Sequence, residues 1–261
     1  MKKCRLIYFI FSILISMIIL SLSIYFQKFV FLTSIITFSI LLSNLQKKKN
    51  EIDEIKKIIL EFNMQCDTDI YLYKLNDFRK KCFFNKKQEA YFNLYIVAGE
   101  IEKGNFDIAK KILLEIDKYN EKFNLLARFI YLKTWCNLFF HENLNEKMKI
   151  MLLKLREIID VINNPQMKIA LLQSYQIEEV KYFILVNREI DKIKTFFIEK
   201  RKRERFLLHK INYTYYQALC DFRNNDLSGG ISLLKEISDM NKDLHICDEA
   251  NKMLKTLEFN K

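Results

Sequence analysis

The chain of 261 residues contains four glycines and a single proline, Pro165. Both residue types interrupt helices, because glycine costs backbone entropy and proline removes a backbone hydrogen-bond donor. Their scarcity predicts helix nearly everywhere, and hence an all-α fold.

The sequence also lacks the motifs of common active sites. It has no glycine-rich phosphate loop, no Gly-x-Ser-x-Gly, no His-Glu-x-x-His and no tandem metal-ligand spacing. The three histidines, His141, His209 and His245, lie far apart in the sequence, and His141 is expected at a surface turn between helices. The six cysteines form no Cys-x-x-Cys pair and are expected to be buried free thiols. We therefore expect no enzymatic activity, catalytic residue, cofactor or metal.

Charge is nearly absent from residues 6–45, where Lys28 is the single charged side chain. The apolar runs 6–26 and 29–45 would form helices of about 32 and 26 Å, close to the bilayer core of about 30 Å. Serine hydroxyls in these runs can bond to the helix backbone. The pattern predicts a membrane anchor over residues 1–50 with two transmembrane helices forming a hairpin. A cleaved signal peptide, one long tilted helix, or a second segment lying in the interface are the alternatives.

Basic residues flank the two apolar runs. Lys2, Lys3 and Arg5 precede the first run, and residues 47–49 are all lysine. The positive-inside rule places both ends in the cytoplasm. Of the net charge of +11, these first 50 residues contribute +7, and the other 211 hold 36 basic and 32 acidic side chains. This balance argues against a nucleic-acid partner.

Helical periodicity continues after the anchor. Residues 51–85 are expected to form connecting helices, and residues 86–261 a helical-repeat domain. In its clearest unit, a helix ending near Gly99 is followed by the turn Lys103-Gly104-Asn105 and by a helix starting at Phe106. A similar pair surrounds Asn224-Asn225-Asp226, and two fainter pairs lie between them. The second helices are expected to begin near Phe106, Leu144, Ile190 and Leu227, and residues 246–257 to form a capping helix.

Small residues recur in the two clear pairs, at Ala98, Gly99, Gly104 and Ala109, and again at Ala218, Cys220 and Gly230. With Phe106 and Leu227 opening the second helices, this arrangement resembles the tetratricopeptide repeat family over residues 86–257. The resemblance implies an α-solenoid of antiparallel helix pairs, with small residues where helices cross and a concave surface that holds peptides or protein segments. The spacing differs from the family's usual 34 residues, and neither a Trp-Leu-Gly motif nor a closing proline is present. A generic helical-hairpin solenoid is the alternative.

The densest basic segment outside the anchor comprises Lys200, Arg201, Lys202, Arg203 and Arg205. The ordinary interpretation of this segment is a solvent-exposed turn followed by the start of a helix. Contact with anionic lipid headgroups, or with an acidic protein or nucleic-acid partner, is the alternative. The aromatic residues Tyr213, Tyr215, Tyr216 and Phe222 are expected in the core, with a peptide groove as the alternative.

These features predict a non-enzymatic scaffold that is integral to the cell membrane as a multi-pass protein. Both termini and the repeat domain would be cytoplasmic, and the repeats would bind a protein or peptide partner. The alternatives are a regulatory membrane protein that senses a peptide or signal, and an accessory subunit of a membrane enzyme or transport complex. The composition, rich in Lys, Ile, Asn and Phe, suggests a bacterial source. Nothing in the sequence indicates an oligomeric state.

Overall fold

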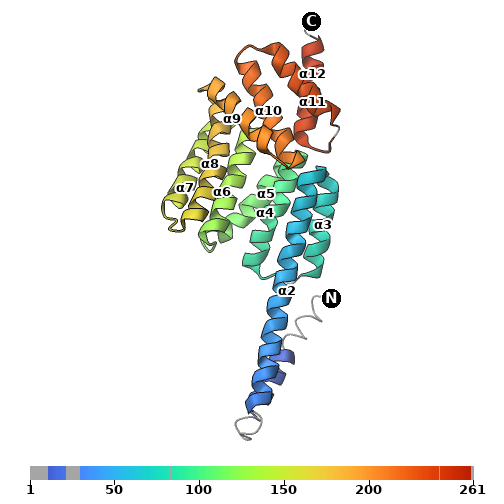
Figure 1. Ribbon diagram of the computed structural model, residues 1–261, viewed down its shortest axis with the longest axis vertical. Helices are drawn as coiled ribbons and strands as arrows, with labels where there is room; N and C mark the ends of the chain where they lie inside the picture. The colour runs from blue at the N-terminus through green and yellow to red at the C-terminus, as the bar shows by residue number, and fades with distance from the viewer. Residues whose placement is uncertain (1–10, 22–29, 83, 241, 260–261) are drawn as a thin grey trace. The chain divides into compact units, whose positions relative to one another are not determined.

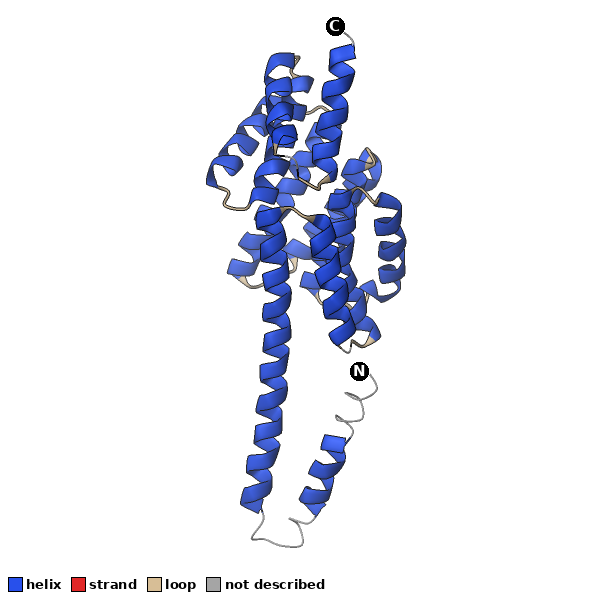
Figure 2. Ribbon diagram, turned by 90° about the vertical axis from the view of Figure 1, so that its right-hand side faces the viewer, coloured by secondary structure: helices blue, strands red, loops and turns tan. Residues whose placement is uncertain are grey.

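The computed structural model describes residues 11–21, 30–82, 84–240 and 242–259, except for the side chains of 30–36, 258 and 259. Within these ranges the chain is helical apart from short turns and one bridging pair, Asp67 with Asp243 (Figures 1 and 2). The expected all-α class is confirmed for the part of the chain described.

The helices follow one another with short connections. A helix over residues 11–21 precedes α2 (Val30–Gln65), α3 (Thr68–Lys81), α4 (Lys86–Lys103), α5 (Phe106–Asn120), α6 (Leu125–His141), α7 (Asn145–Asp160), α8 (Pro165–Leu185), α9 (Ile190–Arg203), α10 (Leu207–Arg223), α11 (Leu227–Asp239) and α12 (His245–Phe259). Two compact units divide the chain. The first lies within residues 1–60 and 73–83, and the second within 61–72 and 84–261.

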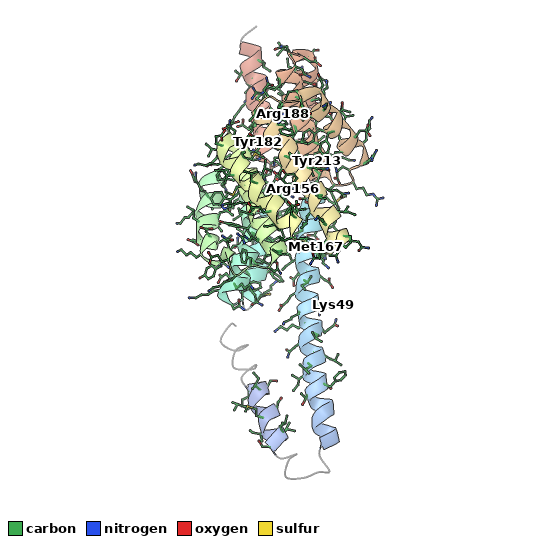
Figure 3. All side chains as sticks on the ribbon, turned by 90° about the vertical axis from the view of Figure 1, so that its left-hand side faces the viewer. Lys49, Arg156, Met167, Tyr182, Arg188 and Tyr213 are labelled. Carbon is green, nitrogen blue, oxygen red and sulfur yellow. The ribbon has the colours of Figure 1, made fainter. Side chains whose placement is uncertain are left out.

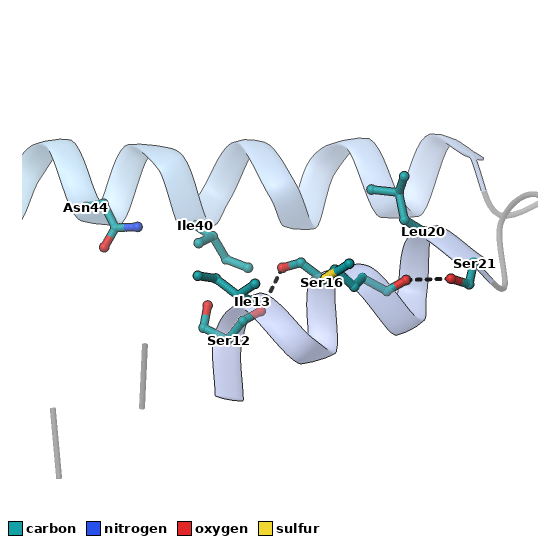
Figure 4. Close-up of a pocket in the computed structure, with 8 residues that line it drawn as sticks. Ser12, Ile13, Ser16, Leu20, Ser21, Ile40 and Asn44 are labelled. Carbon is teal, nitrogen blue, oxygen red and sulfur yellow. Dashed lines mark hydrogen bonds between the residues drawn. The ribbon is translucent and has the colours of Figure 1, made fainter. Parts of the chain in front are cut away.

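In the first unit, helix 11–21 lies beside α2, and the two line a groove that includes Ser12, Ser16, Ile40 and Asn44 (Figure 4). The Ser16 hydroxyl donates to the Ser12 carbonyl at 2.8 Å, and the Ser21 hydroxyl to the Met17 carbonyl at 2.9 Å. These two serines therefore satisfy their hydroxyls on their own helix, as predicted.

The two expected spans, 6–26 and 29–45, fall partly outside the described residues, and the turn at Gln27-Lys28 falls wholly outside them. No helix within the described part of the chain combines the length and the apolar character needed to cross a bilayer. Large apolar side chains nevertheless point to solvent along both helices: Phe11, Ile13, Leu14, Ile15, Met17, Ile18 and Leu20 on the first, and Phe38, Leu41, Leu42 and Leu45 on α2.

Beyond this apolar stretch, α2 continues without a break to Gln65 and includes the short helix expected around residues 52–62. The basic flank lies on this part of α2. Residues 47–49 are exposed, and Lys49 projects from the helix in Figure 3.

The second unit contains four turns of one design. In each turn, a residue with left-handed backbone ends the first helix of a pair: Gly104, Asn143, Asn187 and Asn225, with φ of 86°, 55°, 54° and 60°. The next N–H then donates five residues back, in the bonds Asn105–Glu100, Leu144–Phe139, Arg188–Phe183 and Asp226–Asp221, at 2.8–2.9 Å. This is the Schellman motif, which glycine and asparagine favour because they adopt positive φ at low cost. The fourfold repeat predicted from the sequence is therefore present in the backbone.

The second helices begin at Phe106, Asn145, Ile190 and Leu227, within one residue of the predicted starts. The third turn is longer by one residue, because Glu189 also has a positive φ of 54°. After this turn α9 packs chiefly on α10 rather than on α8. The expected pairing of α8 with α9 as a regular hairpin is thus wrong. Phe197 of α9 packs against the rings of Tyr213 and Tyr216 of α10.

Helices α4, α6, α8 and α10 form an inner row, in which each contacts the next. Helix α12 then contacts both α10 and α4, which closes the row. At the same junction the Thr68 hydroxyl donates to the Asp243 carboxylate. Helix α12 therefore borders the inner helices where the family resemblance implied an open concave surface.

Close helix crossings confirm two of the predicted small-residue positions. A Cβ atom at Gly99 would stand 2.8 Å from the Tyr71 ring, and one at Gly230 would stand 2.8 Å from the Phe222 ring. Ala109 and Ala218 are fully buried as well.

Two other packing positions were wrong. Ala98 is exposed on α4, and Leu227 is 56% exposed because it opens α11 at the surface. Ala98 lies on the side of α4 that carries Glu102 one turn later, so its small side chain leaves that side open.

Candidate functional site

Polar side chains from all five helices of the closed row meet near the carboxyl ends of α4, α6 and α8, around the middle of α10 and at the start of α12. We call this group the inner cluster, and it consists of Glu102, Asn137, His141, Glu178, Lys181, Asn212, Tyr216 and His245. The Schellman turns at Gly104 and Asn143 close α4 and α6 two residues after Glu102 and His141. Residues separated by more than 140 positions in the sequence thus lie together.

Lys181 is the centre of the inner cluster. Its ammonium group donates to Glu178 Oε2 at 2.7 Å and to Asn137 Oδ1 at 2.6 Å. It also lies over the rings of Phe140, at 5.1 Å, and Tyr216, at 5.7 Å. The Lys181 and Glu178 side chains are only 2% and 3% exposed. A buried charge pair of this kind persists only when hydrogen bonds and nearby rings compensate for lost hydration.

Glu102 is the second carboxyl group of the inner cluster, and it forms no ion pair with any residue that the structure describes. Burial raises its pKa to about 7, the charge of Lys181 and a hydrogen bond from Asn212 lower it, and the charge of Glu178 raises it. The Asn212 Oδ1 atom is buried and accepts no hydrogen bond from a described residue. Buried acceptors without a donor are uncommon in folded proteins.

Two histidines meet where the row closes. The His141 ring stacks on Phe106 at 5.4 Å, and the His245 ring lies edge-on to Phe106 at 4.8 Å and to His141 at 5.5 Å. Burial lowers the pKa of both imidazoles, and the charge of Lys181 lowers that of His141 further. His141 lies at the turn that ends α6, as expected, and is partly exposed, although the His245 ring of α12 packs against it.

The side of α6 that carries Asn137 and His141 also carries Lys133, which is partly exposed. Lys133 forms no ion pair or hydrogen bond with the described residues, although its charge lowers the pKa of Glu102. On α4, the exposed Ala98 lies one turn from Glu102. The inner cluster therefore borders a solvent-accessible stretch of the inner helices.

The thiols show no sign of chemical activation. Five cysteines are buried and free: Cys66, Cys82, Cys136, Cys220 and Cys247. Burial raises the pKa of Cys66 to about 12 and raises that of Cys136 as well. A thiol must ionise to act as a nucleophile, so these two are inert at neutral pH. Among the described residues, no three His, Cys, Asp or Glu side chains are grouped to hold a metal ion.

The basic segment forms the last turn of α9, and Arg205 lies in the connection to α10. Arg201 pairs with Glu236 of α11, and the Lys202 and Arg203 side chains pair with Glu199, at 3.1 and 3.5 Å. Lys200 lies over the Phe196 ring at 5.4 Å, and Arg205 is exposed. The segment is thus partly neutralised by its own helix and by α11.

Sequence reasoning placed several aromatic residues correctly and missed the inner cluster. Tyr213, Tyr215 and Tyr216 are buried, as expected for core residues, and Phe222 is partly buried. Glu178 and Lys181 read as an ordinary solvated pair three residues apart, because nothing local indicates that α8 faces an enclosed interior. One signal was available: Asn137 lies on α6, which is predominantly apolar.

No protein-family profile, curated protein or solved structure matches this chain. The four equivalent turns indicate an all-helical repeat array in the part of the chain described.

Proposed function

We propose that the protein is a membrane-tethered helical-repeat protein, akin to tetratricopeptide repeats, whose inner face binds a protein or peptide segment at the cytoplasmic side. The observation that carries the proposal is the exposed apolar surface on helix 11–21 and on residues 38–45. Soluble proteins seldom leave such continuous apolar surface in water, whereas a bilayer covers it favourably.

The serines of helix 11–21 are compatible with a bilayer. Their hydroxyls donate to carbonyls of their own helix, which lowers the free-energy cost of placing them in lipid. The exposed lysines at residues 47–49 would lie at the cytoplasmic headgroups. Together with Lys2, Lys3 and Arg5, they support two spans with both termini inside the cell.

The binding role rests on the inner cluster and on the exposed stretch beside it. Repeat proteins present ligands with side chains from successive inner helices, and here five helices contribute to one group. The protein would act as a non-enzymatic scaffold without a cofactor. Tethering raises the effective concentration of the repeats for partners in the same membrane.

A second candidate is a sensor of a peptide or other signal. The contact of α12 with α4 beside the inner cluster favours it, because a ligand on the inner face would alter how tightly α12 closes the row. Hydrogen exchange in α12, measured with and without a captured partner, distinguishes a sensor from a passive scaffold.

Membrane attachment is tested by alkaline carbonate extraction of cells that express the full chain. The protein should stay with the membranes, and the double substitution Leu14→Arg with Ile18→Arg should reduce that fraction. The matched control is Ile150→Arg with Leu153→Arg, two apolar residues exposed on α7. Extraction of the unaltered protein into the supernatant, or equal effects of both pairs, would contradict the anchor.

Partner binding is tested by crosslinking in cells, followed by purification in mild detergent. Ala98→Arg places a long cationic side chain on the exposed inner face and should abolish recovery of the partner. Leu114→Arg, on the exposed side of α5, is the control and should leave recovery unchanged. Recovery that is unaffected by Ala98→Arg would show that the inner face is not the binding surface.

A further inference from the structure

Helices α2 and α3 are joined by a turn of two residues, Cys66 and Asp67. Cys66 has a left-handed backbone with a φ of 58°, and the Asp67 carboxylate accepts a hydrogen bond from the Ile70 N–H at 2.8 Å. This bond caps the first turn of α3. Because the turn is so short, α3 runs back along α2 (Figure 1). The end of α3 therefore returns toward the exposed apolar residues of α2, within 38–45.

Stacked rings set the register of α3 on α2. The ring centroids of Phe62 on α2 and Tyr71 on α3 are 4.3 Å apart. Both helices rise about 1.5 Å per residue, so Leu75 comes level with Ile58, each four residues from its ring. Both of these residues are buried, as expected where two helices pack against each other. The two helices are therefore antiparallel and packed in this register.

The same register brings the basic end of α3 beside the lysines of α2. Lys81 comes level with Ile52, ten residues from the stacked ring in each helix, and Lys49 lies about 4.5 Å further along the α2 axis. The pKa of Lys81 is raised by a hydrogen bond to Asp77 and by the charge of Glu54 on α2. The influence of Glu54 agrees with this register, because Glu54 lies two residues from Ile52 on α2.

These positions form a group that we call the basic collar: Lys47, Lys48 and Lys49 of α2, and Arg79, Lys80 and Lys81 of α3. All six lie in one compact unit, five are exposed, and Arg79 is partly exposed. Residues 46–57 and 73–82 together hold nine basic and four acidic side chains. Of these acids, Asp53 pairs with Lys56, and Asp77 pairs with Lys81. The basic collar therefore lies in a region with an excess of cations, at the border of the exposed apolar surface.

We propose that the basic collar binds the headgroups of anionic phospholipids at the edge of the bilayer. This proposal rests on the proposed function, since it names the class of lipid that the membrane-tethered protein recognises. With residues 38–45 in hydrocarbon, residues 47–49 lie among the phosphates, and α3 adds three further cations at nearly the same depth. Groups of roughly four to eight Lys or Arg beside a membrane helix attract anionic lipid in this way.

The order of charges along α2 favours lipid over an acidic protein. The first 50 residues contain no acidic side chain, and the acids of α2 begin at Glu51, on the side of residues 47–49 away from the apolar surface. A headgroup that approaches from the apolar side therefore meets cations before it meets acids. An acidic protein would use the charge alone, whereas a phospholipid covers the adjoining apolar surface as well.

The α3 half of the basic collar can be tested without disturbing insertion. Arg79 follows the last exposed apolar residue, Leu45, by 34 positions. Orientation depends on basic residues within about 15–20 positions of a span, so residues 47–49 contribute to it and residues 79–81 do not. Replacing the three α3 cations therefore changes lipid recognition alone.

The test uses the full chain reconstituted in phosphatidylcholine bilayers that contain a trace of spin-labelled lipid. Electron paramagnetic resonance gives the association of labelled phosphatidylglycerol with the protein relative to that of labelled phosphatidylcholine. We expect phosphatidylglycerol to be preferred by about fivefold, the value typical of a basic side chain at an anionic surface. The preference should disappear in about 1 M salt, where the screening length is only about 3 Å.

The decisive variant replaces Arg79, Lys80 and Lys81 by Gln and should at least halve the preference. The matched control replaces Lys147, Lys149 and Lys154 by Gln, three exposed lysines of α7, and should leave the preference unchanged. Lys80→Arg with Lys81→Arg keeps the charge and should retain the preference. No preference for phosphatidylglycerol, a preference that survives the α3 variant, or an equal loss in the α7 control would overturn the proposal.

The anchor and the basic collar fail in different ways. If carbonate leaves the protein in the membrane but phosphatidylglycerol is not preferred, the anchor stands and the basic collar fails. If carbonate releases the protein, the anchor fails, and flotation with phosphatidylglycerol vesicles decides the basic collar. Flotation that the α3 variant abolishes would support lipid binding by the basic collar, and a released chain that does not float with these vesicles would contradict it.

Discussion

The His245 ring occupies the space that a side chain at position 104 would need: a Cβ atom on Gly104 would stand 2.8 Å from His245 Nδ1. Gly104 also has a φ of 86°, which glycine adopts without strain. One glycine thus allows the first Schellman turn to form and lets α12 seat its first residue against that turn. This contact joins the last helix of the row to the first.

Gly104→Ala should therefore destabilise the protein on two grounds. The left-handed backbone alone costs about 1–2 kcal/mol for a residue with a Cβ atom, and the contact with His245 adds to it. Urea unfolding of the full chain in micelles measures the loss. In a His245→Ala background the loss should shrink toward the backbone cost alone. Equal losses in both backgrounds would show that His245 does not seat against position 104.

Lys181→Met should destabilise the protein strongly, because it leaves Glu178 buried without its partner. Breaking one side of a buried pair costs about 3–5 kcal/mol. The double variant Lys181→Met with Glu178→Leu should recover much of this loss, because it leaves no unpaired charge. Lys192→Met, at an exposed pair with Glu189, is the control and should change stability by less than about 1 kcal/mol. A Lys181→Met variant as mild as the control would contradict the buried pair.

Glu102→Gln should become increasingly stabilising as pH rises. The folded-state pKa of Glu102, about 7, lies above its ordinary value of 4.5, so the folded protein binds the extra proton between these values. The corresponding stability is present below pH 4.5 and is lost as pH rises to 7. Gln has no such loss. Unfolding free energies of both proteins from pH 4.5 to 8 should diverge up to about pH 7 and then run parallel, and a constant difference would contradict the raised pKa.

His141 and His245 act in the opposite direction, since their lowered pKa values weaken the fold as pH falls below 6.5. The unaltered protein and the Glu102→Gln variant share this effect of the histidines. The difference between their unfolding free energies therefore reports on Glu102 alone.

Replacing Lys202, Arg203 and Arg205 by Gln should leave stability within about 0.5 kcal/mol, because these side chains are exposed. If the segment contacts anionic lipid, the triple variant should also bind less to vesicles that contain phosphatidylserine, at low salt. Arg201→Gln tests a different contact, the pair with Glu236 that joins α9 to α11. It should lower stability modestly without changing vesicle binding.

The helix order and most helix starts could be predicted because they depend on local chemistry. Gly104 and Asn225 mark turns through their tolerance of positive φ, and Pro165 marks a first helical turn, where the structure indeed begins α8. The longer turn between α8 and α9 could not be predicted. It depends on the positive φ of Glu189, and no sequence pattern marks a glutamate that adopts positive φ.

The inner cluster could not be predicted because it depends on closure of the row. His141 and His245 lie 5.5 Å apart only because α12 returns to α4. No periodic pattern encodes a contact between the last helix and the first. Likewise Glu178 with Lys181 has the spacing of a surface pair, and only the packing of α8 among the other inner helices buries it.

Closure of the inner row is the claim on which the candidate site depends. It requires α12 to begin where Asp243 meets Thr68 of α3 and His245 meets Gly104 of α4, and disulfide trapping tests that placement directly. The Thr68 hydroxyl donates to the Asp243 carboxylate, so the paired variant Thr68→Cys with Asp243→Cys should crosslink rapidly under mild oxidation of the native protein. The single variants should not, because the described native cysteines are buried. A fast intramolecular crosslink, seen as a mobility shift that reducing agent reverses, is the predicted result. A pair that remains reduced in the native protein would contradict the closed row.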